Sequence, residues 1–242
     1  MIVNDGNYEI RMVQDAFLRE EISHYLTQFI TEKRLQRIRQ VIEERTRHVT
    51  VVVEDLFQTQ NISAVLRTCE CYGIQDVHVI ENENEFQIHD AISMGADKWL
   101  TLYRYDSGKN RVRQCVERLK QEGYTIVATT PHEKSYFLDE LPVETPTAFL
   151  FGTELNGLSD EAISLADKTV MIPMYGFTES FNISNSVAII LSRFVEKLRS
   201  SSVLYRLNTS DKEILFFEWL QKSIKNPHLI IDNFLEQKGL HI

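Results

Sequence analysis

The sequence HVTVVVED at residues 48–55 marks a change of pattern in this 242-residue chain. Its run of β-branched residues is typical of a buried strand, whereas the residues before it place apolar groups at helical spacing. From here to about residue 198, strand-like and helix-like segments alternate. The predicted strands are 48–55, 76–81, 99–105, 124–129, 147–152 and 169–174, and the predicted helices are 61–71, 87–96, 111–121, 159–166 and 182–198. This alternation indicates an α/β fold with a mostly parallel sheet and helices on both faces.

Helical patterns flank the α/β region on both sides. Before it lie residues 15–30 and a second helix that Thr31 is placed to cap. After it, residues 211–238 carry aromatic anchors such as Trp219. We therefore expect an N-terminal helical extension (1–47), an α/β domain (48–200) and a C-terminal helical tail (201–242).

The overall composition is that of an ordinary globular protein. The chain has 26 Lys and Arg against 35 Asp and Glu, a formal net charge of −9, and 43% hydrophobic residues. Its apolar runs fall short of the ~20 residues of a membrane span, and its first residues lack the apolar core of an export signal. The histidines, Cys69 and Cys71 lack the spacing of metal ligands. We expect a cytoplasmic protein with no membrane partner and no metal.

Residues 28–50 are locally basic within this acidic protein. Six Lys and Arg stand there against three Glu. Phosphate contacts need such a local cluster rather than a basic total, so the segment is a candidate nucleic-acid surface, with a solvated helix face as the alternative. A second set near the end of the α/β region would extend this surface or form another solvated face: Arg193, Lys197, Arg199 and Arg206.

The segment FLFGTELNGLSDE at 149–161 places two glycines in a turn after a strand. Ligands of open α/β sheets sit beyond the carboxyl ends of strands, where backbone N–H groups are free. Gly152 would allow a ligand to approach the main chain, and Gly157 would allow a left-handed turn. Taken alone, a glycine turn after a strand is more often structural than functional.

The segment MIPMYGFTESFNISNS at 171–186 interrupts a strand and then gathers polar residues. Pro173 cannot donate a hydrogen bond to a neighbouring strand, so the sheet pairing is expected to stop there. The backbone groups left unpaired at this strand end could bind a flat heterocycle through hydrogen bonds. A helix cap requires one polar residue, but three gather here: Ser180, Asn182 and Ser184. Capping and turn formation are the alternative explanation.

The segment QTQNISAVLRTCECYG at 58–73 predicts a helix that Asn61 caps and Gly73 ends. Arg67 lies within this helix. Its guanidinium group could hold a phosphate or a carboxylate, although most such arginines are solvated or ion-paired surface residues.

These three segments, in this order, resemble the SPOUT superfamily of RNA methyltransferases, most closely its TrmH branch. The first motif is matched by NISAVLRT (61–68), the second by FGTELNGL (151–158) and the third by IPMYGFTESFNIS (172–184). The resemblance extends from about residue 33 to residue 200. Asn185 and Ser186 depart from it, because small apolar residues are usual there.

The resemblance implies features that hydrophobic periodicity cannot give. It implies a deep C-terminal trefoil knot, where periodicity alone predicts an unknotted sheet. The knot would form the site for S-adenosylmethionine, and dimerisation would bring a second subunit against it. The implied reaction is 2′-O-methylation of a ribose in RNA, with the guanosine at position 18 of the tRNA D-loop as the specific target.

The catalytic residues and most donor contacts follow from their positions in the motifs, Thr129 follows from the end of the preceding strand, and the RNA contacts follow from the basic segment. Arg67 would stabilise or deprotonate the attacking ribose oxygen and hold the adjacent phosphate. The expected catalytic residues are Arg67, Asn61, Glu154, Ser180 and Asn182. The expected contacts with the methyl donor are Thr129, Phe151, Gly152, Gly157, Ile172, Met174 and Phe181. The expected contacts with RNA are Lys33, Arg34, Arg37 and Arg39.

Other functions stay open at this point. The nearest is 2′-O-methylation of ribosomal RNA, but members of the family that act on it often carry an α/β RNA-binding domain before the sheet, where this chain has helical patterns. A second is a non-catalytic RNA-binding protein on the same scaffold. A nicotinamide-dependent oxidoreductase on a similar sheet would need a GxGxxG fingerprint, which the sequence lacks.

Overall fold

The computed structural model describes residues 15–84, 86–131, 136–153 and 155–240. The chain forms two compact units. One is Thr46–Tyr205, and the other combines the described residues before Thr46 with those after Tyr205. Glu154 and the ends of both predicted extensions, 1–14 and 241–242, lie outside the described residues.

The unit Thr46–Tyr205 is built on a seven-stranded sheet in which all neighbouring strands are parallel. The strand order is β3-β2-β1-β6-β4-β7-β5. The strands are β1 (Val49–Glu54), β2 (Asp76–Ile80), β3 (Thr101–Tyr105), β4 (Thr125–Thr129), β5 (Tyr136–Phe137), β6 (Thr147–Phe151) and β7 (Lys168–Met171). The predicted parallel sheet is confirmed, and the two-residue strand β5 was not predicted.

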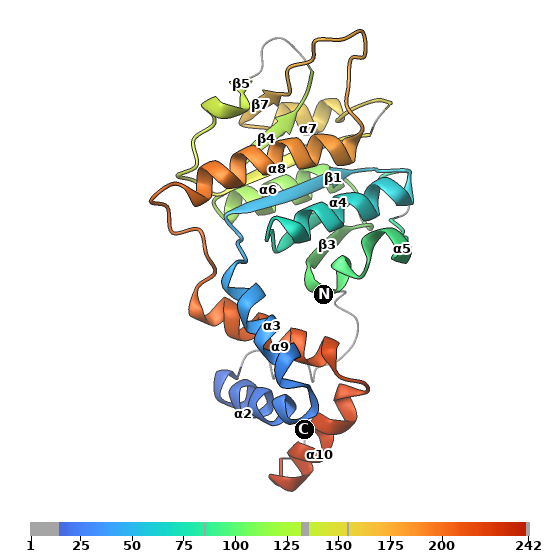
Figure 1. Ribbon diagram of the computed structural model, residues 1–242. Coiled ribbons are helices and arrows are strands. Elements are labelled where there is room, and N and C mark those ends of the chain that lie inside the picture. Colours follow the sequence, from blue (N-terminus) through green and yellow to red (C-terminus); the bar gives the residue numbers. More distant parts are fainter. Residues whose placement is uncertain (1–14, 85, 132–135, 154, 241–242) are drawn as a thin grey trace. The chain divides into compact units, whose positions relative to one another are not determined.

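Helices cover both faces of the sheet, as predicted (Figure 1). They are α4 (Thr59–Cys71), α5 (Asp90–Ser93), α6 (Arg111–Gln121), α7 (Asp160–Leu165) and α8 (Ile183–Arg199). Successive side chains of a strand point to opposite faces. Accordingly, Val51 and Val53 of β1 lie in the core with residues of α4 and α8, whereas Val52 lies in the core with residues of α6 and α7.

The helix predicted over 87–96 is wrong at both ends, since α5 covers only Asp90–Ser93. Two other wrong boundaries bear on the pocket described below. Helix α4 begins at Thr59 rather than at Asn61, so Asn61 lies inside the first turn and does not cap the helix. Strand β7 ends at Met171 rather than at residue 174. Its neighbour β4 ends at Thr129, opposite Val170, so the chain beyond Met171 has no strand of β4 to pair with.

The second unit packs helices from the two ends of the chain together. These are α2 (Ala16–Leu26), α3 (Glu32–Glu43), α9 (Thr209–Ser223) and α10 (Pro227–Gln237). Helix α9 packs against α2 and α3, and α10 packs against α2. Thr31 caps α3 as predicted, since its side chain accepts a hydrogen bond from Arg34 N at 3.3 Å. The helical tail over 211–238 consists of two helices, which Asn226 separates with a left-handed φ of 53°.

A buried cluster of titratable side chains lies on β2, β3 and α6. The His78 ring stacks on Tyr103 with centroids 4.6 Å apart, and its Nδ1 lies 3.0 Å from the Tyr105 hydroxyl. Burial lowers the pKa of His78 to about 3 and raises the pKa of Cys115 to about 12. Both groups are therefore neutral at physiological pH, as the packed interior of the sheet requires.

Helices α2 to α10 lack the combination of length and apolar composition that crossing a bilayer requires, as far as the described residues extend. Within the same stretches, no three His, Cys, Asp or Glu side chains come together as a potential metal site.

Candidate active site

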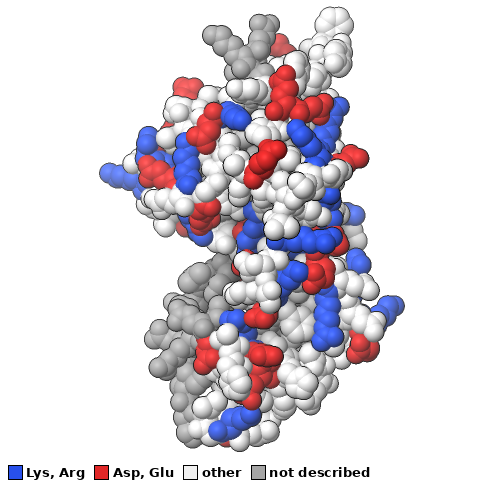
Figure 2. All heavy atoms as spheres, turned by 90° about the vertical axis from the view of Figure 1, so that its left-hand side faces the viewer, with Lys and Arg blue, Asp and Glu red and all other residues white. Residues whose placement is uncertain are grey.

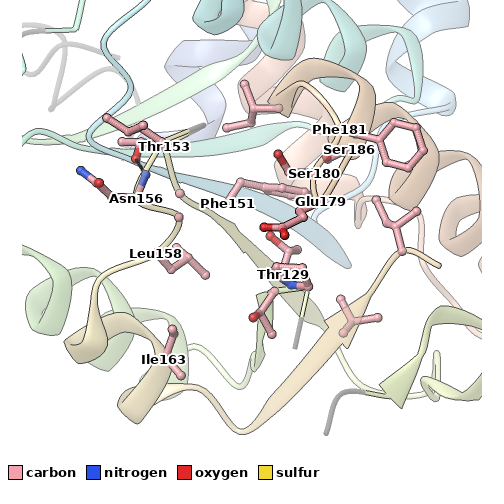
Figure 3. A pocket seen from close by; sticks show the side chains of 18 of the residues that line it. Thr129, Phe151, Thr153, Asn156, Leu158, Ile163, Glu179, Ser180, Phe181 and Ser186 are labelled. Carbon is pink, nitrogen blue, oxygen red and sulfur yellow. Dashed lines mark hydrogen bonds between the residues drawn. The ribbon is translucent and has the colours of Figure 1, made fainter. Parts of the chain in front are cut away.

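A pocket of about 330 Å³ opens at the carboxyl ends of β4, β6 and β7 (Figure 3). Its walls come from these strand ends and from the loops that follow β6 and β7. Open parallel sheets bind ligands at this edge, and the volume lies within the ~300–1,000 Å³ of small-molecule sites. All seven residues predicted to contact the methyl donor line the pocket: Thr129, Phe151, Gly152, Gly157, Ile172, Met174 and Phe181.

The pocket combines apolar walls with main-chain polar groups. Phe151 is buried, Ile172 and Met174 are partly buried, and the loop that carries the last two is free of sheet pairing. Thr129 donates its hydroxyl hydrogen to the Leu150 carbonyl oxygen at 2.8 Å, which fixes this side chain at the strand end. A flat heterocycle fits such a site, because apolar side chains can cover its faces while backbone groups bond its edge.

The loop after β6 is a tight hairpin that only glycine permits at its base. Thr153 and Gly157 exchange two backbone hydrogen bonds, each of 3.0 Å. Gly157 has a φ of +69°, a left-handed conformation that favours glycine. A Cβ atom on Gly152 would lie 2.1 Å from the carbonyl carbon and oxygen of Gly157. Gly152 therefore lets the two sides of the hairpin close together at the pocket.

Asn61 and Asn182 hydrogen bond to each other although 121 residues separate them in sequence. Asn182 Nδ2 donates to Asn61 Oδ1 at 3.1 Å, and Asn61 Nδ2 donates to Gln58 Oε1 at 3.0 Å. Asn182 Oδ1 accepts from the backbone N–H of Ser184 at 2.9 Å and so caps α8. This chain of amides joins the first turns of α4 and α8 beside the pocket residue Phe181.

The remaining predicted catalytic residues are placed differently. Ser180 lines the pocket. Arg67 is exposed on α4, six residues beyond Asn61, and is not among the residues that line the pocket. Its guanidinium group makes no ion pair with any residue in the described ranges. The structure thus brings Asn61, Asn182 and Ser180 to one region and leaves Arg67 exposed on the neighbouring surface.

Sequence reasoning missed Glu179 and Gln58. Glu179 lies directly before Ser180, and it is the one charged side chain among the described residues that line the pocket. The sequence did contain a signal for Glu179. Helix capping explained the hydroxyl and amide side chains of this segment, but it did not explain a carboxylate. Gln58 carried no comparable signal, because its partner Asn61 was expected to act as a helix cap.

The predicted RNA-binding residues lie on α3 in the second unit, and all four are exposed. Arg34 Nε lies 3.5 Å from the Ser223 hydroxyl, and the Arg39 guanidinium lies 5.6 Å from the centroid of the Phe216 ring. Lys33 and Arg37 form no ion pair with any residue that the structure describes. Their charges are therefore available to an anionic partner.

Basic residues near the end of the other unit already have internal contacts. Arg193 lies 3.9 Å from the Asp139 carboxylate, and Lys197 Nζ donates to the carbonyl oxygens of Asp139 and Leu141 at 2.8 and 2.7 Å. Basic and acidic side chains are interspersed over the face drawn in Figure 2. These contacts favour the solvated-face interpretation for Arg193 and Lys197.

Comparison with known proteins places this arrangement in a family. The model of the SpoU rRNA Methylase family matches residues 48–192. The chain is 42% identical over 205 residues to the tRNA (guanosine(18)-2'-O)-methyltransferase of Borreliella burgdorferi, a match that covers 85% of this chain and 92% of that protein.

Solved structures give the same result. The crystal structure of the Aquifex aeolicus TrmH/SpoU tRNA modifying enzyme superposes with a TM-score of 0.72 and 29% identity, covering 81% of this chain and 98% of that one. The SpoU methyltransferase AviRb of Streptomyces viridochromogenes, in complex with the cofactor AdoMet, gives a TM-score of 0.56 and 25% identity, covering 67% and 62% of the two chains. This chain belongs to the SpoU rRNA Methylase family.

Proposed function

We propose that this protein transfers a methyl group from S-adenosylmethionine (AdoMet) to the 2′-oxygen of guanosine 18 in tRNA. The observation that carries this proposal is the 42% identity, over 85% of the chain, to a relative named for that reaction. The pocket supports it, since all seven residues predicted for donor contact line one cavity at the carboxyl edge of the sheet.

The residues of the pocket suit AdoMet. Phe151, Ile172 and Met174 offer apolar surface for the adenine ring, and the hairpin closed at Gly152 brings main-chain groups to the cavity. When bound, AdoMet supplies a methyl group on a positively charged sulfur, which keeps the electron pair of the broken S–C bond. AviRb, a member of the same family, is solved in complex with AdoMet.

The chain itself must position the ribose and stabilise charge on its oxygen. As the new C–O bond forms, the 2′-hydroxyl would release its proton to solvent at this exposed surface, and Arg67 would stabilise the developing alkoxide while holding the adjacent phosphate. A guanidinium group keeps its proton in proteins and is a poor base, so electrostatic stabilisation is the role we assign. The Asn61–Asn182 hydrogen bond would fix the position of α4, which carries Arg67, against α8.

We also propose the SPOUT-type trefoil knot and a homodimer. Strand β6 enters the sheet between β1 and β4, and Lys197 of α8 bonds to two carbonyl oxygens of the connection that precedes β6. This connection would form the loop that the C-terminal part of the unit passes through. The nearly fully exposed rings of Tyr175 and Phe177, in the loop after β7, offer apolar surface for a second copy. A cytoplasmic location follows from a tRNA substrate.

The proposed reaction is tested with labelled AdoMet and a tRNA transcript. We expect label on the ribose of guanosine 18, identified after nuclease digestion. The matched control is the same transcript with adenosine at that position, and ribosomal RNA serves as the alternative acceptor. Label on ribosomal RNA and none on tRNA would replace the proposed substrate, and transfer to neither would favour a non-catalytic RNA-binding protein.

The proposed RNA surface on α3 is tested by reversing two of its charges. We expect Arg37→Glu with Arg39→Glu to weaken tRNA binding by about tenfold or more at low salt, since each phosphate contact contributes about 0.7–0.9 to the salt slope. AdoMet affinity should not change. The control is Lys109→Glu, which reverses the charge of an exposed side chain in the other unit. Unchanged tRNA affinity in the double variant would move the RNA surface elsewhere.

A further inference from the structure

Glu179 places a carboxylate in the pocket, the one charged group among the described side chains that line it. Among the described residues that line the cavity, the others are apolar, hydroxyl, amide or glycine residues. The Glu179 side chain points into the pocket, toward Thr129 (Figure 3). The cavity therefore presents net negative charge to whatever enters it.

The contacts of this carboxylate with the described residues give it no structural role. Asn182, not Glu179, caps α8, and Asn182 also bonds to Asn61. Glu179 makes no hydrogen bond or ion pair with another described residue. Its side chain is exposed at the pocket, where a cationic ligand can reach it.

We propose that Glu179 distinguishes the cationic methyl donor from its neutral product, an inference that rests on the proposed function. AdoMet carries a sulfonium, an ammonium and a carboxylate, for a net charge of +1. After methyl transfer the sulfur is an uncharged thioether, and S-adenosylhomocysteine (AdoHcy) has a net charge of zero. A carboxylate in the pocket attracts the first molecule and has little net interaction with the second.

The position of Glu179 in the pocket brings its charge near a donor bound there. Charges interact over ~10 Å at 0.1 M salt, and Glu179 shares one cavity of about 330 Å³ with the seven residues expected to contact the donor. Glu179 therefore acts on the charge of a donor bound among these residues. Because the side chain is exposed, its interaction is weakened by solvent and corresponds to about fivefold in affinity. This preference for donor over product would help AdoHcy leave after each turnover.

Glu179 acts here on binding and not as a base. Stabilising the sulfonium favours the bound donor more than the transition state, in which the positive charge is already dispersing. Removing the charge should therefore raise KM for AdoMet while leaving kcat unchanged or slightly higher. A general base would give the opposite result, a fall in kcat with little change in donor affinity.

The experiment is isothermal titration of the full-length protein and its Glu179→Gln variant with three compounds. These are AdoMet, AdoHcy and sinefungin, an analogue with a protonated amine near the position of the sulfonium. We expect Glu179→Gln to lower the affinity for AdoMet and sinefungin by about fivefold at 0.1 M salt. The affinity for AdoHcy should change by less than twofold. Glu179→Asp should keep the preference, and 0.5 M salt should reduce it in the parent protein.

The control is Glu196→Gln, which removes the same charge from an exposed position on α8 outside the pocket. It should bind all three compounds like the parent. Equal weakening of AdoMet and AdoHcy, no change in any compound, or a loss of kcat at unchanged affinity would each overturn the proposal. Failure of the parent protein to bind AdoMet at all is a separate result, which would count against the proposed function itself.

Discussion

Arg67→Ala is expected to lower kcat for tRNA methylation by about 10²- to 10³-fold, the usual cost of removing one group that stabilises a developing oxyanion. The affinity for AdoMet should not change, because Arg67 is not among the residues that line the pocket. The fold should also survive, since the side chain is exposed on α4 and forms no ion pair with a described residue. Single-turnover methyl transfer at saturating AdoMet and tRNA measures the loss.

Arg67→Lys separates charge from geometry. Lysine keeps the positive charge but loses the planar fork that can hold a phosphate and an alkoxide together. We expect this variant to retain tRNA affinity and to lose at least about tenfold in kcat. Arg113→Ala, which removes an exposed arginine of α6 with only surface ion pairs, is the control and should keep full activity. Near-normal transfer by either Arg67 variant, with normal RNA binding, would end the catalytic assignment.

The sequence was sufficient for the parts of this protein that depend on local pattern. Alternating β-branched strands and amphipathic helices predicted the parallel sheet, and α6 has the predicted bounds of residues 111 and 121. The predicted donor-binding residues come from three separate strand ends, yet the structure places them around one pocket. Parallel strands share a carboxyl edge, so residues that follow different strands meet there.

What the sequence could not provide depends on partners far apart in the chain. The behaviour of Asn61 is the clearest case, because a helix-capping residue and an amide bonded to Asn182 have the same local signature. The end of β7 was misplaced because it is decided by the end of β4 beside it. The packing of α9 against α2 and α3 joins the two ends of the chain, which no local pattern can predict.

Gly152→Ala is expected to weaken donor binding severely. A Cβ atom at this position would lie 2.1 Å from the Gly157 carbonyl and 2.2 Å from Leu158 N, distances at which the backbone must move. The hairpin closed by Thr153 and Gly157 would open, and its main-chain groups would leave the pocket. We expect AdoMet affinity to fall by about 100-fold or more, since both the shape and the polar contacts of the site are lost, and stability to fall by about 1–3 kcal/mol. Calorimetry and thermal unfolding measure the two effects.

Two other glycines provide matched controls. A Cβ atom on Gly176 would meet no heavy atom within 4 Å, and the φ of this residue is not positive. Gly176→Ala should therefore leave the melting temperature unchanged. Gly157→Ala has open space around its Cβ but a φ of +69°, so it should cost about 1 kcal/mol through backbone strain alone. A Gly152→Ala variant that bound AdoMet like the parent protein would show that the hairpin is not part of the donor site.

The Gly152 and Arg67 variants together test how the proposed dimer builds its active site. Arg67→Ala leaves the pocket intact, and Gly152→Ala leaves Arg67 intact. If Arg67 acts on the pocket of the other protomer, a mixed dimer of the two variants contains one complete site. The pocket of this site comes from the Arg67→Ala protomer, and its arginine comes from the Gly152→Ala protomer. We expect such a mixture to regain methyl transfer, because Arg67 does not line the pocket of its own chain. A mixture of verified heterodimers that stays inactive would instead mean that RNA bridges Arg67 and the pocket within one protomer.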